Sequence, residues 1–165
     1  MTYLSRLAMV LLVAASAATA SNNENERRSL KGLKAVNVAV EDLKPEVEQG
    51  GLNKTSIQSD VELKLRQAGI AVLTKAEMRA TPGAPYLYIN VSTHSGSLYS
   101  VSITVELCQA VRLDRDPSLW LPDATTWSVM GVGVVGRDKL PELRDGIKHY
   151  IDQFINAYLS VNPRK

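Results

Sequence analysis

The sequence predicts an α+β fold, with a mixed, largely antiparallel sheet of about five strands and two main helices packed on one face. The first observation is that apolar and polar residues alternate with period two in several segments, as in strands with one buried face. The second is that two other segments carry apolar residues at helical spacing. The third is that glycines and prolines fall between these segments, where turns are expected. The predicted order is strand, helix, strand, short helix, three strands and helix.

The first 20 residues have the three parts of a secretory signal peptide. Arg6 precedes an apolar run over residues 7–13, and residues 18–20 then read Ala-Thr-Ala, the small-residue pattern that signal peptidase cleaves. The alternative is a membrane anchor, but the apolar run is shorter than the roughly 20 residues needed to span a bilayer. No cysteine lies near the cleavage site to carry a lipid. We therefore expect an exported protein in the bacterial periplasm, without a stable membrane anchor, whose mature chain begins at Ser21.

Composition excludes some classes of function. The chain has 19 Lys and Arg against 17 Asp and Glu, a net charge of +2. Removal of Arg6 with the signal peptide leaves the mature chain with one excess positive charge. Such a balance argues against a nucleic-acid partner, because phosphate binding requires a dominant basic face. Cys108 is the only cysteine, so the fold contains no internal disulfide and must be stabilised by packing.

The mature chain is expected to form one folded unit. Residues 21–32 are polar and show no apolar periodicity, so we expect a disordered lead-in there. A single α/β domain is expected over residues 33–162, followed by a short tail at 163–165. Its size is sufficient to bury a core without disulfides.

The first half of the domain contains two predicted strands and two predicted helices. Alternating valines predict a strand over residues 36–40, and a glycine pair predicts a loop within 46–54. An apolar stripe predicts a helix over 57–68, which a glycine ends. Residues 70–73 then form a short apolar strand, and 74–77 match a capping box that begins a short helix.

The second half contains three strands and the longest helix. Alternation predicts strands over residues 86–92 and 99–113, joined by a hairpin connection. Aspartates and prolines predict a loop over 114–123, before a third strand over 125–135. A broad apolar face predicts the last helix over 141–161, with a proline in its first turn.

This layout resembles the small periplasmic α/β accessory domains of cell-envelope assembly and transport lipoproteins, and the N-terminal domain of TolB-type periplasmic proteins. The resemblance covers residues 33–162 and rests on the order of elements together with the predicted export. It implies an accessory role in the cell envelope. No family motif accompanies it, so it assigns no functional residue.

The polar faces of the long strands form the candidate binding surface. Its residues alternate with aliphatic ones along two predicted strands and are Tyr86, Tyr88, Ser102, Thr104 and Glu106. Tyrosine is enriched at recognition surfaces because it combines apolar area with a polar tip. The leading interpretation is therefore an exported, non-enzymatic envelope module that binds a protein or another envelope component through an open sheet face. The alternative partner on this face is a second copy, in a homodimer.

A second class of function is an exported hydrolase. Cys108 could act as a nucleophile with His94 or His149 as its base, since a thiolate needs a nearby proton acceptor. Asp114 and Asp116 could instead form a pair of loop acids. An inert thiol and a loop ion pair explain the same residues more simply.

No cofactor or metal site is expected. Gly131, Gly133 and Gly136 match the dinucleotide fingerprint, but the helix that follows is the last element, so no second parallel strand completes the unit. The glycines are better explained by close approach of another element to the sheet. The two histidines and the cysteine are too far apart in sequence to form a recognisable zinc pattern.

Overall fold

The computed structural model describes residues 23–163, and the predicted signal peptide lies outside them. Five strands form one sheet in the order β2-β1-β3-β4-β5. Their bounds are β1 Ala35–Val40, β2 Ala71–Leu73, β3 Tyr86–Ser95, β4 Tyr99–Leu113 and β5 Asp116–Val135. Strand β1 runs parallel to β2 and β3, whereas the pairs β3/β4 and β4/β5 are antiparallel. The predicted α+β class and mixed sheet are confirmed.

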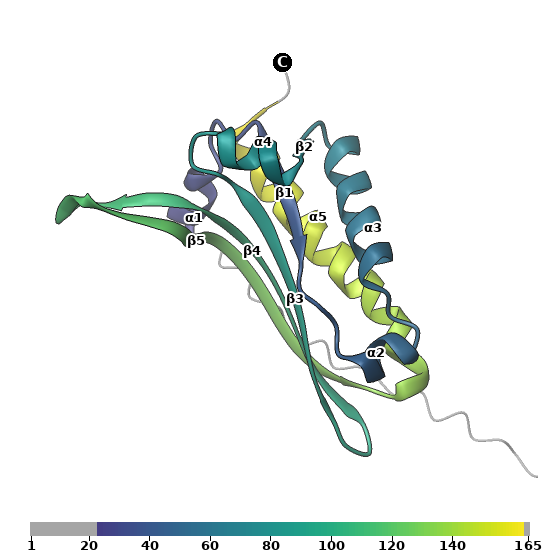
Figure 1. Ribbon diagram of the computed structural model, residues 1–165. Helices are drawn as coiled ribbons and strands as arrows, with labels where there is room; N and C mark the ends of the chain where they lie inside the picture. The colour runs from purple at the N-terminus through teal and green to yellow at the C-terminus, as the bar shows by residue number, and fades with distance from the viewer. Residues whose placement is uncertain (1–22, 164–165) are drawn as a thin grey trace, which may run out of the picture.

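The two main helices cover one face of the sheet, as predicted (Figure 1). The helices are α1 Glu24–Ser29, α2 Pro45–Gln49, α3 Lys54–Gln67, α4 Lys75–Ala80, the 3-10 helix η1 Arg137–Glu142 and α5 Leu143–Val161. Helices α3 and α5 pack side by side, and Arg144 of α5 donates two hydrogen bonds to Asp60 of α3, at 3.0 and 2.7 Å.

The hydrophobic core lies between the sheet and helices α3 and α5. Alternate residues of each long strand are buried, including the valines of β1 and the aliphatic residues of β3 and β4. At the β5 side, Trp127 meets Phe154 of α5 edge-to-face, with ring centroids 5.2 Å apart. These buried rows explain why the period-two pattern was readable in the sequence.

The short helix α4 borders the other face of the sheet. The chain passes from β1 through α3 to β2 in one direction across the sheet, and from β2 through α4 to β3 in the opposite direction. Both connections join parallel strands, and because such crossovers are right-handed, the two helices lie on opposite faces. One face is thus covered by α3 and α5, and the other is open except where α4 borders it.

The predicted disordered lead-in at residues 21–32 is wrong from residue 23 onward. Residues 24–29 form α1, whose N-cap Asn23 accepts a hydrogen bond from the backbone N–H of Asn25 at 3.0 Å. Leu30, directly after the helix, is fully buried in the core. A single buried leucine gives no periodic signal, so composition alone suggested disorder.

The predicted loop at 114–123 is also wrong over most of its length. Strand β5 begins at Asp116, so β4 and β5 continue as a long hairpin that extends past the other strands (Figure 1). Its prolines are tolerated because β5 is an edge strand, which has no neighbour for its outward N–H groups to bond. The predicted loop at 46–54 contains the short helix α2.

Candidate functional site

The structure brings part of the predicted binding surface together. Tyr86 and Tyr88 of β3 lie opposite Cys108 and Glu106 of β4, on the open face of the sheet. Both tyrosines and Glu106 are half-buried. These residues share one end of the open face because the antiparallel pairing of β3 and β4 fixes their register.

The other two predicted residues lie farther along the same face. Thr104 and Ser102 of β4 are opposite Asn90 and Ser92 of β3 on one side, and opposite Met130 and Val132 of β5 on the other. They therefore border a second region of the open face, in which β5 presents apolar side chains.

A pocket of about 480 Å³ lies above the two tyrosines. We call it the tyrosine pocket. Its walls come from β1, β3, the end of β4, helix α4 and the β4–β5 hairpin, and its lining residues include Asn37, Met78, Tyr86, Tyr88, Trp120 and Asp123. The pocket exists because α4 and the hairpin both rise from the open face. The sequence pattern does not mark Trp120 or Met78. Trp120 lies in an exposed part of β5 that lacks alternation, and the position of α4 follows only from the crossover.

Both tyrosine hydroxyls are held by carboxylates. The hydroxyl of Tyr86 donates to Oδ1 of Asp123 at 3.3 Å, and that of Tyr88 donates to Oε2 of Glu41. Partial burial and the neighbouring Cys108 raise the pKa of Tyr86. The hydrogen bond to Glu41 and partial burial raise the pKa of Tyr88. Both phenols are therefore neutral at physiological pH, and their rings are fixed in position.

The rim of the pocket is charged and its outer wall is aromatic. Lys75 and Arg79 of α4 are exposed along one side, and Asp123 lies on the hairpin side. Trp120 is 62% exposed, the most exposed of the large apolar side chains in the described part of the chain. Exposed aromatic and cationic side chains around fixed tyrosines are typical of a recognition surface.

Cys108 lies opposite Tyr86 on the open face, but it is only 5% exposed. A β-bulge at Thr126 places Thr125 of β5 opposite Cys108 on one side, and Tyr86 of β3 lies opposite it on the other. Burial raises the pKa of the thiol, so it is protonated at neutral pH. The burial and the raised pKa of Cys108 therefore favour the inert thiol over the nucleophile.

The candidate hydrolytic residues are not brought together. His94 is opposite Ser100 near the far end of β3, eight residues from Tyr86, which is roughly 27 Å along a strand. His149 is exposed on α5, on the helix side of the sheet. Asp116 binds Ser118 through two hydrogen bonds of 3.1 and 2.6 Å, which lower the pKa of its carboxyl group. It stabilises the tip of the hairpin.

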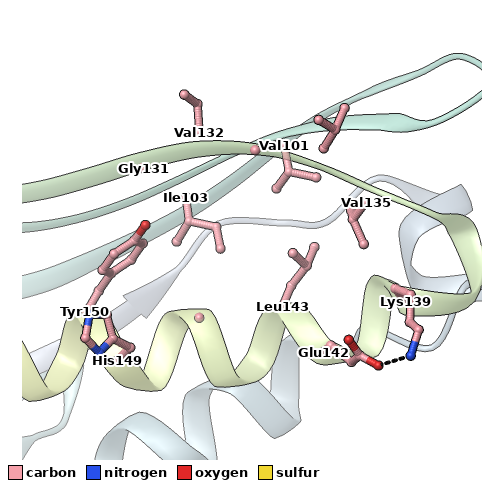
Figure 2. A pocket seen from close by; sticks show the side chains of 13 residues that line it. Val101, Ile103, Gly131, Val132, Val135, Lys139, Glu142, Leu143, His149 and Tyr150 are labelled. Carbon is pink, nitrogen blue, oxygen red and sulfur yellow. Dashed lines mark hydrogen bonds and ion pairs between the residues drawn. The ribbon is translucent and has the colours of Figure 1, made fainter. Parts of the chain in front are cut away.

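A second cavity, of about 370 Å³, lies on the helix side at the β5 edge (Figure 2). Val101 and Ile103 point from β4 toward Leu143 and Tyr150 of α5, so the lining is mainly apolar. Gly131 and Gly133 pair with β4 inside strand β5 and therefore do not form the phosphate-binding turn of a dinucleotide site. At residue 131 close approach is confirmed, because a Cβ atom would overlap the Tyr150 hydroxyl.

Within residues 23–163, no helix is long and apolar enough to cross a membrane. The same residues include no group of three or more His, Cys, Asp and Glu side chains arranged to hold a metal ion. No protein-family model, curated protein or solved structure matches this chain.

Proposed function

We propose that this protein is an exported, non-enzymatic module of the cell envelope that binds a protein or another envelope component through the open face of its sheet. The observation that supports this function is the tyrosine pocket, in which three aromatic side chains from β3 and the hairpin surround a hollow on the uncovered face. Recognition sites are commonly concave, mainly apolar and lined by a few fixed polar groups.

The pocket is organised before any partner arrives. Carboxylates hold both tyrosine hydroxyls, and paired strands hold their backbone, so binding costs little side-chain entropy. Lys75 and Arg79 offer charged contacts at the rim, and the exposed ring of Trp120 offers apolar area. Together they suit a partner segment that combines apolar and acidic side chains.

The hydrolase alternative has less support from the geometry. A nucleophilic cysteine needs an accessible thiolate with a base within hydrogen-bonding reach. Cys108 is buried with a raised pKa, and both histidines lie on other parts of the molecule.

Pull-down of the mature protein from its own envelope fraction tests the proposal. The double change Tyr86→Ala with Tyr88→Ala, and separately Trp120→Ala, should weaken capture of the same partner by about 30-fold or more, corresponding to about 2 kcal/mol for anchor residues. Because none of the three side chains belongs to the core between the sheet and helices α3 and α5, thermal unfolding should change little.

Leu63→Ala is the matched control, since Leu63 is exposed on α3, on the opposite side of the sheet. It should capture the partner like the wild-type protein. If all variants recover the same partners equally, the open face is only solvated and the proposal fails. If the double tyrosine variant unfolds, the Trp120→Ala result alone decides.

A further inference from the structure

Within residues 23–163, the outer edge of β5 is covered along one part and has no neighbour along another. Helix α1 covers it at residues 126–128, where the Ser29 hydroxyl donates to the carbonyl oxygen of Thr126 at 3.0 Å and the N–H of Ser128 donates to Glu26 at 3.4 Å. Beyond Ser128, the strand continues to Val135 as the last strand of the sheet. This free edge is Met130–Val135.

The free edge presents backbone groups and apolar side chains together. In an antiparallel ladder, residues point their N–H and C=O groups to alternate sides. Because the N–H of Ser128 points outward, those of Met130, Val132 and Val134 do so as well. Their side chains lie on the open face and are 56%, 58% and 52% exposed, and Figure 2 shows Val132 pointing away from the cavity on the helix side.

Among the described residues, Met130–Val135 is not protected against strand addition by a charged side chain, a proline or a covering segment. Natural edge strands carry charged residues, prolines or covering segments that prevent pairing with another chain. Residues 124–135 contain no charged residue and no proline. On the helix side, Gly131 and Gly133 have no side chain that would hinder an approaching strand.

We propose that the occupant is a second copy of this chain, paired antiparallel through β5 about a twofold axis with Val132 opposite Val132 of the second copy. In this register each residue with an outward N–H group has such a residue opposite it. Met130 of each copy lies opposite Val134 of the other, and the two Val132 residues lie opposite each other. Val135, the last residue of the strand, then lies opposite Val129 of the other copy, which directly follows the part of the edge that α1 covers. The free length of the edge therefore fits the length of the strand that it receives.

Charge complementarity at both ends favours a second copy over another apolar strand. In this register, strand β5 of the second copy ends beside α1 of the first copy, and its chain continues from there through Gly136. The exposed Arg137, followed by Asp138, begins η1 there. Helix α1 carries Glu24 and Glu26 in its first turn, which lies beside Ser128, and Arg27 and Arg28 in its last turn. The twofold axis repeats this opposite-charge pair at the other end, as isologous interfaces require.

Engineered cysteines in the mature protein, residues 21–165, test the register. A directly opposed, hydrogen-bonded pair has Cα atoms about 5.5 Å apart, within the span of a disulfide. Val132→Cys should therefore cross-link two copies under air oxidation. Met130→Cys is the matched control, because its two copies would lie about 14 Å apart. Equal cross-linking of both variants, or of neither, would overturn the proposal.

Sedimentation equilibrium tests the association itself. Val132→Pro removes an outward N–H while keeping the bonds to β4, so it should weaken the dimer at least tenfold, whereas Val132→Thr, which keeps that N–H, should not. Arg137→Glu should also weaken it, and adding Glu24→Arg should restore it.

If the wild-type protein is monomeric at all concentrations, the proposal fails. It also fails if the edge binds a different envelope protein, which would be shown by a partner whose capture is abolished by Val132→Pro. Should Val132→Pro fail to fold, the cross-linking comparison still decides. The inference is independent of the tyrosine pocket, since the changes at Tyr86, Tyr88 and Trp120 leave the β5 edge intact.

Discussion

Glycine at position 131 leaves room for the side chain of Tyr150 under strand β5. A Cβ atom there would overlap the tyrosine hydroxyl and lie 2.9 Å from Cζ. Gly133, two residues farther on the same face, has nothing within 4 Å of the equivalent position. The two glycines therefore have different roles although the sequence presents them as one repeated pattern.

This difference predicts opposite effects of the same substitution. Gly131→Ala should lower the free energy of unfolding by about 1–3 kcal/mol, because Tyr150 must move out of its place. Gly133→Ala should be neutral or stabilise by up to about 1 kcal/mol, because alanine restricts the unfolded chain and meets no obstacle. Urea denaturation of both variants checks the expectation, and equal destabilisation would show that Tyr150 does not fix residue 131.

At the scale of elements, α4 is a short helix whose stability depends on its first turn. Thr74 accepts a hydrogen bond from the N–H of Glu77 at 3.3 Å, and the Glu77 carboxylate accepts from the Thr74 N–H at 2.7 Å and from its hydroxyl at 2.8 Å. These bonds lower the pKa of Glu77. Because α4 forms one wall of the tyrosine pocket, the capping box also holds Lys75 and Arg79 in place.

Thr74→Ala should loosen α4 without unfolding the rest of the molecule. Loss of the cap costs about 1 kcal/mol, which should speed amide hydrogen exchange in α4 about fivefold. Because the pKa of Glu77 is lower in the folded protein, its carboxylate stabilises α4 fully above the ordinary pKa of a glutamate. This stabilisation is lost as the pH falls through the pKa of Glu77 in the folded protein. The protection of the α4 amides, which compares their exchange rate with that of an unfolded peptide at the same pH, should therefore fall in acid. Thr55→Ala on α3, an exposed threonine with no capping role, is the control.

The sequence predicts elements well where a buried face exists and poorly where it does not. Residues 36–40, 86–92 and 125–135 alternate because one side faces the core, and all three lie in strands. The hairpin at 116–123 extends past the core, so its side chains are exposed and no alternation marks the strand. The open face could likewise be predicted from the positions of tyrosine and serine residues. The tyrosine pocket could not, because its prediction requires the handedness of the crossover through α4, which no residue pattern shows.

At the scale of the whole molecule, the tyrosine pocket and the free β5 edge occupy separate parts of the sheet. The pocket lies where α4 and the hairpin border the open face, and the free edge lies at the opposite end of β5. A dimer formed through β5 would make one continuous sheet of both copies and present two pockets, which raises the avidity for a partner with repeated sites.

The position of α1 gives the last prediction, which concerns processing of the whole chain. Cleavage after Ala20 would leave Asn23, the N-cap of α1, two residues inside the new terminus, so α1 and its contacts with β5 would remain intact. If residues 1–20 are removed as predicted, the purified protein should have the intact mass of residues 21–165. Ala20→Arg should block cleavage, because signal peptidase accepts only small residues there, whereas Thr19→Arg, at the unrestricted middle position, should be processed normally. Full-length wild-type chain in the membrane fraction would show that residues 1–20 are a retained anchor instead.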